Sequence, residues 1–165
     1  MAAAGPFARR RKGGVDVTLT EPEIAVLRSV VEQMEIVLVA PEEIPHARRL
    51  FPPAYEDDDE AQAEFARLTT ADLADGKRRA LASVKATLER GVTKKDAWRA
   101  SLSPEEAEDW LAVLNDTRLT LGTRLEVTEQ TYDKEIDPAD PDAAASEIFR
   151  YLGYVEDWLV ETLMG

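Results

Sequence analysis

Cysteine is absent from this chain of 165 residues. A chain without thiols forms no disulfide, offers no thiolate to a zinc ion and has no thiol nucleophile or thiol redox sensor. No apolar run approaches the ~18 residues that a membrane-spanning helix needs. The segment 1–12 lacks the apolar stretch of a secretory signal. We therefore expect a cytoplasmic protein without a membrane partner.

Positive charge is scarce as well: 20 Lys and Arg residues stand against 33 acidic residues, and the net charge is −13. This balance disfavours a general phosphate-binding surface, so contact with DNA would need a local basic patch. The dense basic patch is Arg9-Arg10-Arg11-Lys12. It can be interpreted as a clamp for an acidic protein or a nucleic acid, or as charged protection of an edge strand.

Hydrophobic periodicity predicts a mainly α fold, with about five helices packed as a single-domain bundle over residues 1–165. A small N-terminal β-hairpin is expected over 7–20, with its turn at Gly13-Gly14. The pattern of caps and apolar residues predicts helices over 21–40, 59–68, 70–90 and 103–125 and from 141 onward, and an extended stretch over 97–102.

Thr70 is expected to cap the helix 70–90, with Leu73 facing inward. Two acidic, proline-bearing connections separate these elements, over 41–60 and 128–141. Connections of that length are uncommon in a compact domain and are either functional or mobile. The segment 1–6 is expected to be flexible.

The helix over 103–125 is the most informative one, because Arg118 projects from its apolar face, between Leu111 and Leu125. A guanidinium among leucines needs a carboxylate or carbonyl partner. Arg118 is therefore either half of an internal ion pair or an anchor for an acidic partner or ligand. Asp116 and the cluster Lys77–Arg79 are expected to face water.

The last helix is apolar around most of its circumference, from Ile148 to Leu163. Such a helix is either the central core helix or has one face in the core and another at an interface. The residues that we single out as interaction candidates are Arg9, Arg10, Arg11, Lys12, Asn115, Arg118, Arg124, Tyr151, Tyr154 and Trp158.

The sequence contains few patterns that are typical of catalytic or metal-binding sites. His46, the sole histidine, follows Glu42 and Glu43 without the spacing of a helical metal site. No Gly-rich phosphate loop and no recognisable nucleophile setting occur. No catalytic residue, metal ligand or cofactor is predicted.

Three strings carry a resemblance: RLFPPAY at 49–55, EFARLT at 64–69 and WLAVLNDTRLTLGTRL at 110–125. They resemble an actinobacterial family of about this length that is described as a domain of unknown function. Its genes commonly lie near those for a proteolytic adaptor and for a metallopeptidase of cysteine metabolism. Some members are designated oxidative-stress transcriptional regulators. The resemblance implies a regulatory protein that acts through protein contacts, with the transcription apparatus as a candidate partner.

This chain departs from that pattern because redox-sensing members need a cysteine pair, which is missing here. The leading hypothesis is a non-enzymatic regulatory or adaptor protein that binds another protein. A homodimer is one form of it, since Arg9–Lys12 complements Glu56–Glu60 in sign. The first alternative is a direct DNA-binding regulator that uses Arg9–Lys12, and the second is a small metal-binding or hydrolytic protein that uses His46.

Overall fold

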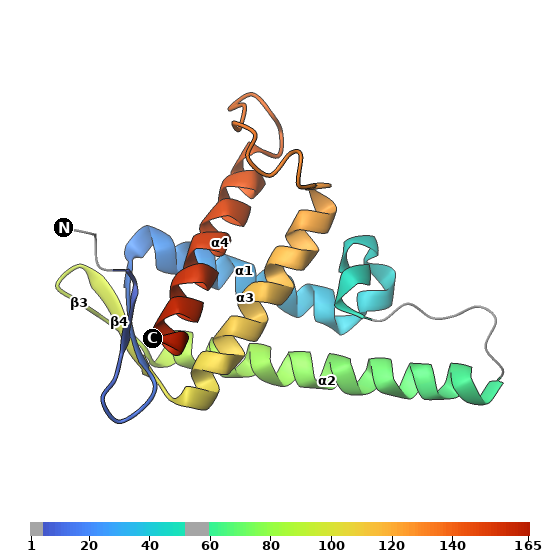
Figure 1. Ribbon diagram of the computed structural model, residues 1–165, viewed down its shortest axis with the longest axis horizontal. Helices are drawn as coiled ribbons and strands as arrows, with labels where there is room; N and C mark the ends of the chain where they lie inside the picture. The colour runs from blue at the N-terminus through green and yellow to red at the C-terminus, as the bar shows by residue number, and fades with distance from the viewer. Residues whose placement is uncertain (1–4, 52–59) are drawn as a thin grey trace.

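The computed structural model describes residues 5–51 and 60–165. Helices account for most of this part, and a small antiparallel sheet lies at one end of the molecule (Figure 1). The elements are β1 (Phe7–Arg9), β2 (Val15–Thr20), α1 (Glu21–Val39), η1 (Pro41–Glu43), η2 (Pro45–Leu50), α2 (Glu60–Arg90), β3 (Val92–Lys94), β4 (Ala97–Leu102), α3 (Pro104–Arg124) and α4 (Ala143–Met164). The predicted mainly α fold with an N-terminal hairpin is confirmed.

The sheet has the strand order β1-β2-β4-β3. Val15, Val17 and Leu19 are buried, and the residues between them are exposed, as the alternation in β2 predicts. The predicted extended stretch over 97–102 is β4, which pairs with β2. Sequence reasoning missed β3, because three residues carry no periodic signal and its turn to β4 contains no glycine.

Capping boxes start both helices for which the sequence predicts them. At α1, Thr20 Oγ1 accepts from the Glu23 N–H at 3.3 Å, and the Glu23 carboxylate accepts from the Thr20 N–H at 2.7 Å. Ser103 and Glu106 exchange the same two bonds at α3, at 3.1 and 3.0 Å. These reciprocal bonds satisfy N–H groups that a helix start leaves open, so each helix begins where its cap stands.

The helices predicted over 59–68 and 70–90 are one helix, α2, of 31 residues. Thr70 does not cap it, because its hydroxyl donates to the Ala66 carbonyl at 2.9 Å, a bond available inside a continuous helix. Leu73 is 37% exposed, and Ala74 takes the buried position instead. At ~1.5 Å per residue α2 is about 46 Å long, and its N-terminal end projects past the other helices (Figure 1).

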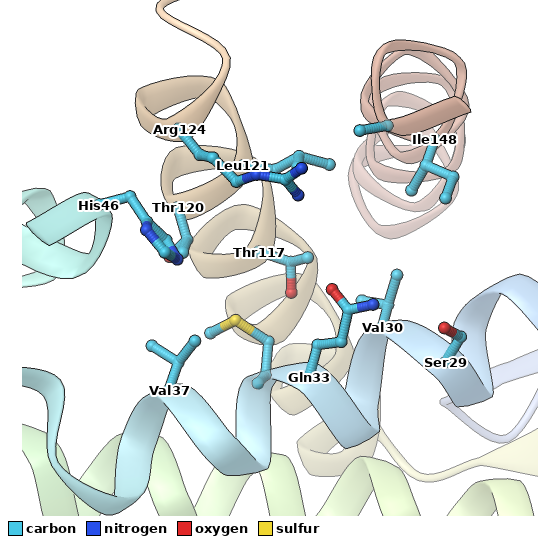
Figure 2. Close-up of a pocket in the computed structure, with 12 residues that line it drawn as sticks. Ser29, Val30, Gln33, Val37, His46, Thr117, Thr120, Leu121, Arg124 and Ile148 are labelled. Atoms are coloured by element: carbon cyan, nitrogen blue, oxygen red, sulfur yellow. The ribbon is translucent and has the colours of Figure 1, made fainter. Parts of the chain in front are cut away.

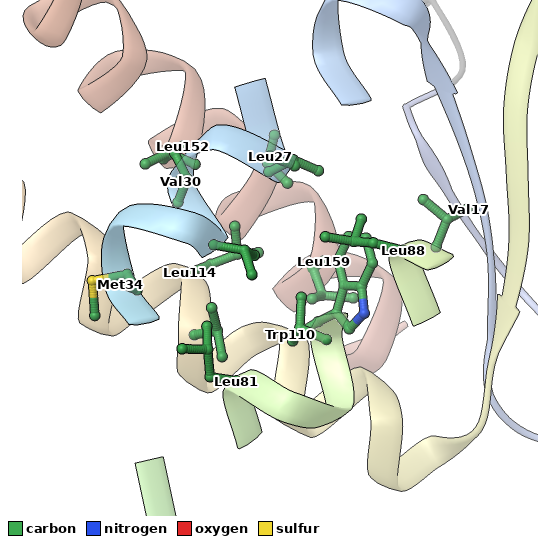
Figure 3. Close-up of a cluster of buried hydrophobic side chains, with 14 of the residues drawn as sticks. Val17, Leu27, Val30, Met34, Leu81, Leu88, Trp110, Leu114, Leu152 and Leu159 are labelled. Atoms are coloured by element: carbon green, nitrogen blue, oxygen red, sulfur yellow. The ribbon is translucent and has the colours of Figure 1, made fainter. Parts of the chain in front are cut away.

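The core lies between the sheet and the four α-helices, and Figure 3 shows part of it, including Leu81 of α2, Leu114 of α3 and Leu152 of α4. Trp98 and Trp110 stack at its centre, with 6.4 Å between ring centroids. The Trp110 indole N–H donates to Thr87 Oγ1 at 2.7 Å, and Thr87 is fully buried. A buried polar group needs such a partner, so this bond fixes how α2 and α3 pack.

The two long connections differ. In the part of 41–60 that the structure describes, η1 and η2 form, and Leu50 is buried. The acidic run up to Asp59 lies outside the described residues. Turns occupy most of 128–141, and α4 begins at Ala143, two residues later than predicted.

Part of the segment 1–6 is also outside the described residues. The Pro6 carbonyl accepts from the Thr18 N–H at 2.8 Å, so the hydrogen bonding of the hairpin extends one residue before β1. No helix among the described residues is long and apolar enough to span a membrane.

Candidate functional site: a basic sheet surface

One face of the sheet packs against helices, and the other is open to solvent. The register places Asp16 beside Ser101 and Thr18 beside Arg99, and all four side chains are exposed. Short polar contacts cross this face: Ser101 Oγ donates to Asp16 Oδ1 at 2.6 Å, and the Arg99 guanidinium lies 3.4 Å from Thr18 Oγ1. Antiparallel sheets commonly have one solvated face; the unusual feature here is its charge.

Positive charge is concentrated on this sheet. The segments 7–20 and 91–102 hold seven Lys or Arg residues and two Asp residues, a net charge of +5. Because the whole chain carries −13, the remainder carries −18. We call Arg9–Lys12, Lys94, Lys95 and Arg99 the basic sheet surface; all of these residues are exposed. A separation of charge on this scale creates a field that attracts acidic surfaces to one end of the molecule.

Most cations of the basic sheet surface lack an acidic partner. Arg10 Nε lies 3.4 Å from Asp16 Oδ1, and this is the ion pair that the surface contains among the described residues. Arg9–Lys12 surround the β1–β2 turn, which Gly13 and Gly14 close with positive φ angles of 90° and 86°. The predicted patch Arg9–Lys12 is therefore presented at a tight hairpin tip.

A second basic turn lies at the opposite end of the strands. Lys95 and Asp96, between β3 and β4, both have positive φ angles, 54° and 61°. Two-residue hairpins of this kind favour Asn-Gly, since β-carbons are crowded in the left-handed region. Lys94, Lys95 and Arg99 are thus part of the surface only because β4 pairs with both β2 and β3. In the sequence, these three cations are marked only by a short segment that is poor in acidic residues.

Arg118 of α3, one of the interaction candidates, forms an ion pair inside the molecule. Its Nη1 donates to Glu156 Oε2 of α4 at 2.8 Å, and its Cζ lies 5.4 Å from the centroid of the Phe149 ring. The guanidinium passes over Gly153, where a β-carbon would lie 3.4 Å from Nη2, in ordinary van der Waals contact. The structure therefore shows the internal ion pair, one of the two roles that the sequence left open for Arg118.

The neighbours of Arg118 differ from the expectation in one respect. Asp116 does not face water freely: it pairs with Lys77 at 2.9 Å, and the two side chains are 13% and 19% exposed. Arg78 stays exposed, although its Nε donates to the Leu38 carbonyl at 2.8 Å. The prediction that Lys77–Arg79 forms a wet face is therefore wrong for Lys77, because α2 packs against α3 there. Asn115 is exposed.

The candidates in α4 divide by face. The Tyr151 hydroxyl is buried with no hydrogen-bond partner in the described structure, and burial raises the pKa of this hydroxyl. Tyr154 and Trp158 are 64% and 38% exposed, with ring centroids 6.4 Å apart. Leu152 is fully buried in the core. The helix therefore has one face in the core and another that is open, so it is not a central helix buried on all sides.

Arg124 and His46 lie apart from the basic sheet surface, at a pocket between helices. Arg124 Nη2 lies 3.3 Å from Asp142 Oδ1, and both side chains are about half exposed. Among the described residues, no three His, Asp or Glu side chains are placed to hold a metal ion together.

These observations define an acidic, mainly helical protein. Its sheet packs against helices on one face, is open on the other and concentrates positive charge. The chain belongs to the family described as "Domain of unknown function (DUF2017)", whose sequence profile matches residues 4–163. It is also similar to a curated protein of Mycobacterium leprae (strain TN) named "Putative oxidative stress regulator AosR", with 28% identity over 136 residues. No solved structure matches the chain significantly.

The alignment with the Mycobacterium leprae protein covers 74% of this chain and 60% of that protein. The chain thus spans less than two thirds of the length of that relative. The family and the name of the relative agree with the resemblance found in the sequence.

Proposed function

We propose that this chain is a non-enzymatic regulatory or adaptor protein whose basic sheet surface binds an acidic patch on another protein. The observation that carries the proposal is the separation of charge, +5 on the sheet segments against −18 elsewhere. Cations that lack local partners lose few interactions on binding and gain new ones. The name of the relative, an oxidative stress regulator, supports a regulatory role.

The side chains of the open sheet face favour a protein partner over nucleic acid. Surfaces that bind single strands combine cations with exposed aromatic rings on which bases stack. Here Phe7 and Trp98 are buried on the opposite face, and the exposed face presents Thr18, Arg99 and Ser101. Duplex DNA would extend past the sheet into the unfavourable field of the remainder of the chain, which carries −18, whereas a local acidic patch would meet mainly the sheet.

Several charged side chains away from the basic sheet surface join elements of the fold. Glu106, whose pKa is lowered chiefly by its hydrogen bond from Arg90, joins α3 to the end of α2. Arg118 and Lys77 pair with carboxylates between helices. In each case the ionised group holds elements together, which is a structural use of charge.

The test compares two variants that have the same net charge. One loses cations of the basic sheet surface, and the other loses cations elsewhere. The sheet variant carries Arg11→Ser, Lys12→Ser and Lys94→Ser; the control carries Arg28→Ser, Arg49→Ser and Arg79→Ser. All six side chains are exposed and form no ion pair in the described structure. Both variants should fold like the native chain, because exposed polar substitutions change stability little.

Native chain, sheet variant and control are immobilised, and proteins captured from a cell extract are quantified. We expect one or more acidic proteins to bind the native chain and the control, to be lost from the sheet variant and to dissociate as salt rises. Capture that is equal for all three chains contradicts the proposal. Tight binding of duplex DNA by the native chain, lost in the sheet variant, would favour the DNA-binding alternative instead.

A further inference from the structure

A pocket of about 160 Å³ opens between α1, α3, α4 and η2 (Figure 2). None of its lining residues belongs to the basic sheet surface. Its apolar wall includes Val30 and Met34 of α1 and Ile148 of α4. Figure 2 shows the side chains of Gln33, Thr117 and Ile148 pointing into the space between these helices. The pocket thus combines an apolar wall with polar groups, as sites for small ligands do.

The polar lining is rich in donors and contains no carboxylate. The side chains of Gln33, His46 and Ser29 form no hydrogen bond among the described residues. Arg124 uses one amino group on Asp142. None of the twelve lining residues is Asp or Glu, although acidic residues make up 33 of the 165 in the chain. A negatively charged ligand would meet donors along this lining, and the acidic group beside them is Asp142, the partner of Arg124.

Two further features select where the charge of a ligand would sit. The hydroxyls of Thr117 and Thr120 donate to the carbonyls of Val113 and Asp116 at 2.7 and 2.9 Å, so their oxygens can only accept. The charged donor for an anion is therefore Arg124, and Ala145 belongs to the first turn of α4, where backbone N–H groups lack partners within the helix. Both lie at the same end of the pocket lining, where α3 ends and α4 begins.

We propose that this pocket binds a small aliphatic monocarboxylate, with the carboxylate on Arg124 and the chain against Val30, Met34 and Ile148. Its volume of about 160 Å³ equals that of about five water molecules at ~30 Å³ each in the liquid, and a carboxylate with a short aliphatic chain is of that size. Asp142 is a weak competitor for Arg124, because half-exposed ion pairs contribute little. The site is independent of the proposed adaptor role.

Isothermal titration calorimetry with pentanoate tests the proposal, with pentanamide and acetate as comparison ligands. We expect pentanoate to bind with a Kd of about 1 mM or tighter, as the binding energy per atom of a very small ligand permits. Pentanamide lacks the charge and acetate lacks the chain, so each should bind at least about tenfold more weakly.

Two variants probe the two halves of the pocket. Arg124→Gln removes the cation, and Ala145→Leu fills the space beside it; each should weaken pentanoate binding by about tenfold or more. Arg79→Gln, at an exposed cation outside the pocket, is the matched control and should leave binding unchanged. Because Arg124 is exposed, its substitution keeps the fold and decides the test even where the filled pocket disturbs packing.

Absence of heat up to about 10 mM pentanoate would overturn the proposal, because a Kd that weak leaves no specific recognition. Equal binding of pentanamide, or binding unchanged by Arg124→Gln, would overturn it as well. The variant with Arg11→Ser, Lys12→Ser and Lys94→Ser should bind pentanoate normally, which separates this outcome from that of the adaptor test.

Discussion

Replacing Arg118 by leucine removes one half of an ion pair that joins α3 to α4. The side chains of Arg118 and Glu156 are 25% and 14% exposed, so the pair is mostly but not fully buried. Breaking a fully buried pair costs about 3–5 kcal/mol, because a charge remains without a partner, whereas exposed pairs contribute about 0–1 kcal/mol. We therefore expect Arg118→Leu to lower the free energy of unfolding by about 2–3 kcal/mol.

A loss of this size should be visible in a melting curve. For a chain of this length 1 kcal/mol corresponds to roughly 2–4 °C, so the Tm should fall by about 5–10 °C. Urea denaturation at neutral pH gives the same quantity as a free energy. The matched control is Arg124→Leu, whose partner Asp142 is half exposed; it should cost less than about 1 kcal/mol.

A double-mutant cycle isolates the pair itself. The chain with Arg118→Leu and Glu156→Leu strands no charge, so it should be more stable than Arg118→Leu alone, with a coupling energy of about 1–3 kcal/mol. If Arg118→Leu lies within about 0.5 kcal/mol of the native chain, as a surface substitution would, the internal role of Arg118 is refuted. Additivity of the two single changes would refute it equally.

Three further predictions concern stability. Thr87→Val removes the acceptor of the Trp110 indole N–H and should cost about 1–3 kcal/mol in urea denaturation; an unchanged midpoint contradicts this. Gly91→Ala places a β-carbon 2.1 Å from the indole of β4, so it should cost at least about 1–3 kcal/mol, and a neutral effect would show that the close approach is relieved. The Arg90 hydrogen bond lowers the pKa of Glu106 below its ordinary 4.5, which adds stability above that pH and loses it as the pH falls through and below it. Native protein should therefore lose more stability than Arg90→Gln between about pH 6 and 3, and equal losses contradict this.

Several predictions could be read from short stretches of the chain because their causes are local. The capping boxes at Thr20 and Ser103, the glycine turn at Gly13-Gly14 and the alternation in β2 each depend on residues within three or four positions. The need of Arg118 for a partner was equally plain, since a charged group among leucines must be paired. These features needed no knowledge of the fold.

Where two helical patterns meet, local evidence was misleading. A threonine at position 70 predicts a helix start, yet its hydroxyl bonds back to the Ala66 carbonyl within α2. Both uses of the threonine satisfy a hydrogen bond, so the choice between them is made by the packing of α2 against α1 and α3. The exposed position of Leu73 follows from the same continuous helix.

Composition and local pattern by themselves determined that this is an acidic, thiol-free, mainly helical chain with a basic hairpin. The tertiary structure alone decided that Glu156 is the partner of Arg118, that Lys77 holds Asp116, and that Lys94 and Arg99 lie on the same sheet as the hairpin cations. These contacts join residues that are distant in the chain. Periodicity reports which face of an element is buried but not which other element covers it, and that is the physical reason for the division.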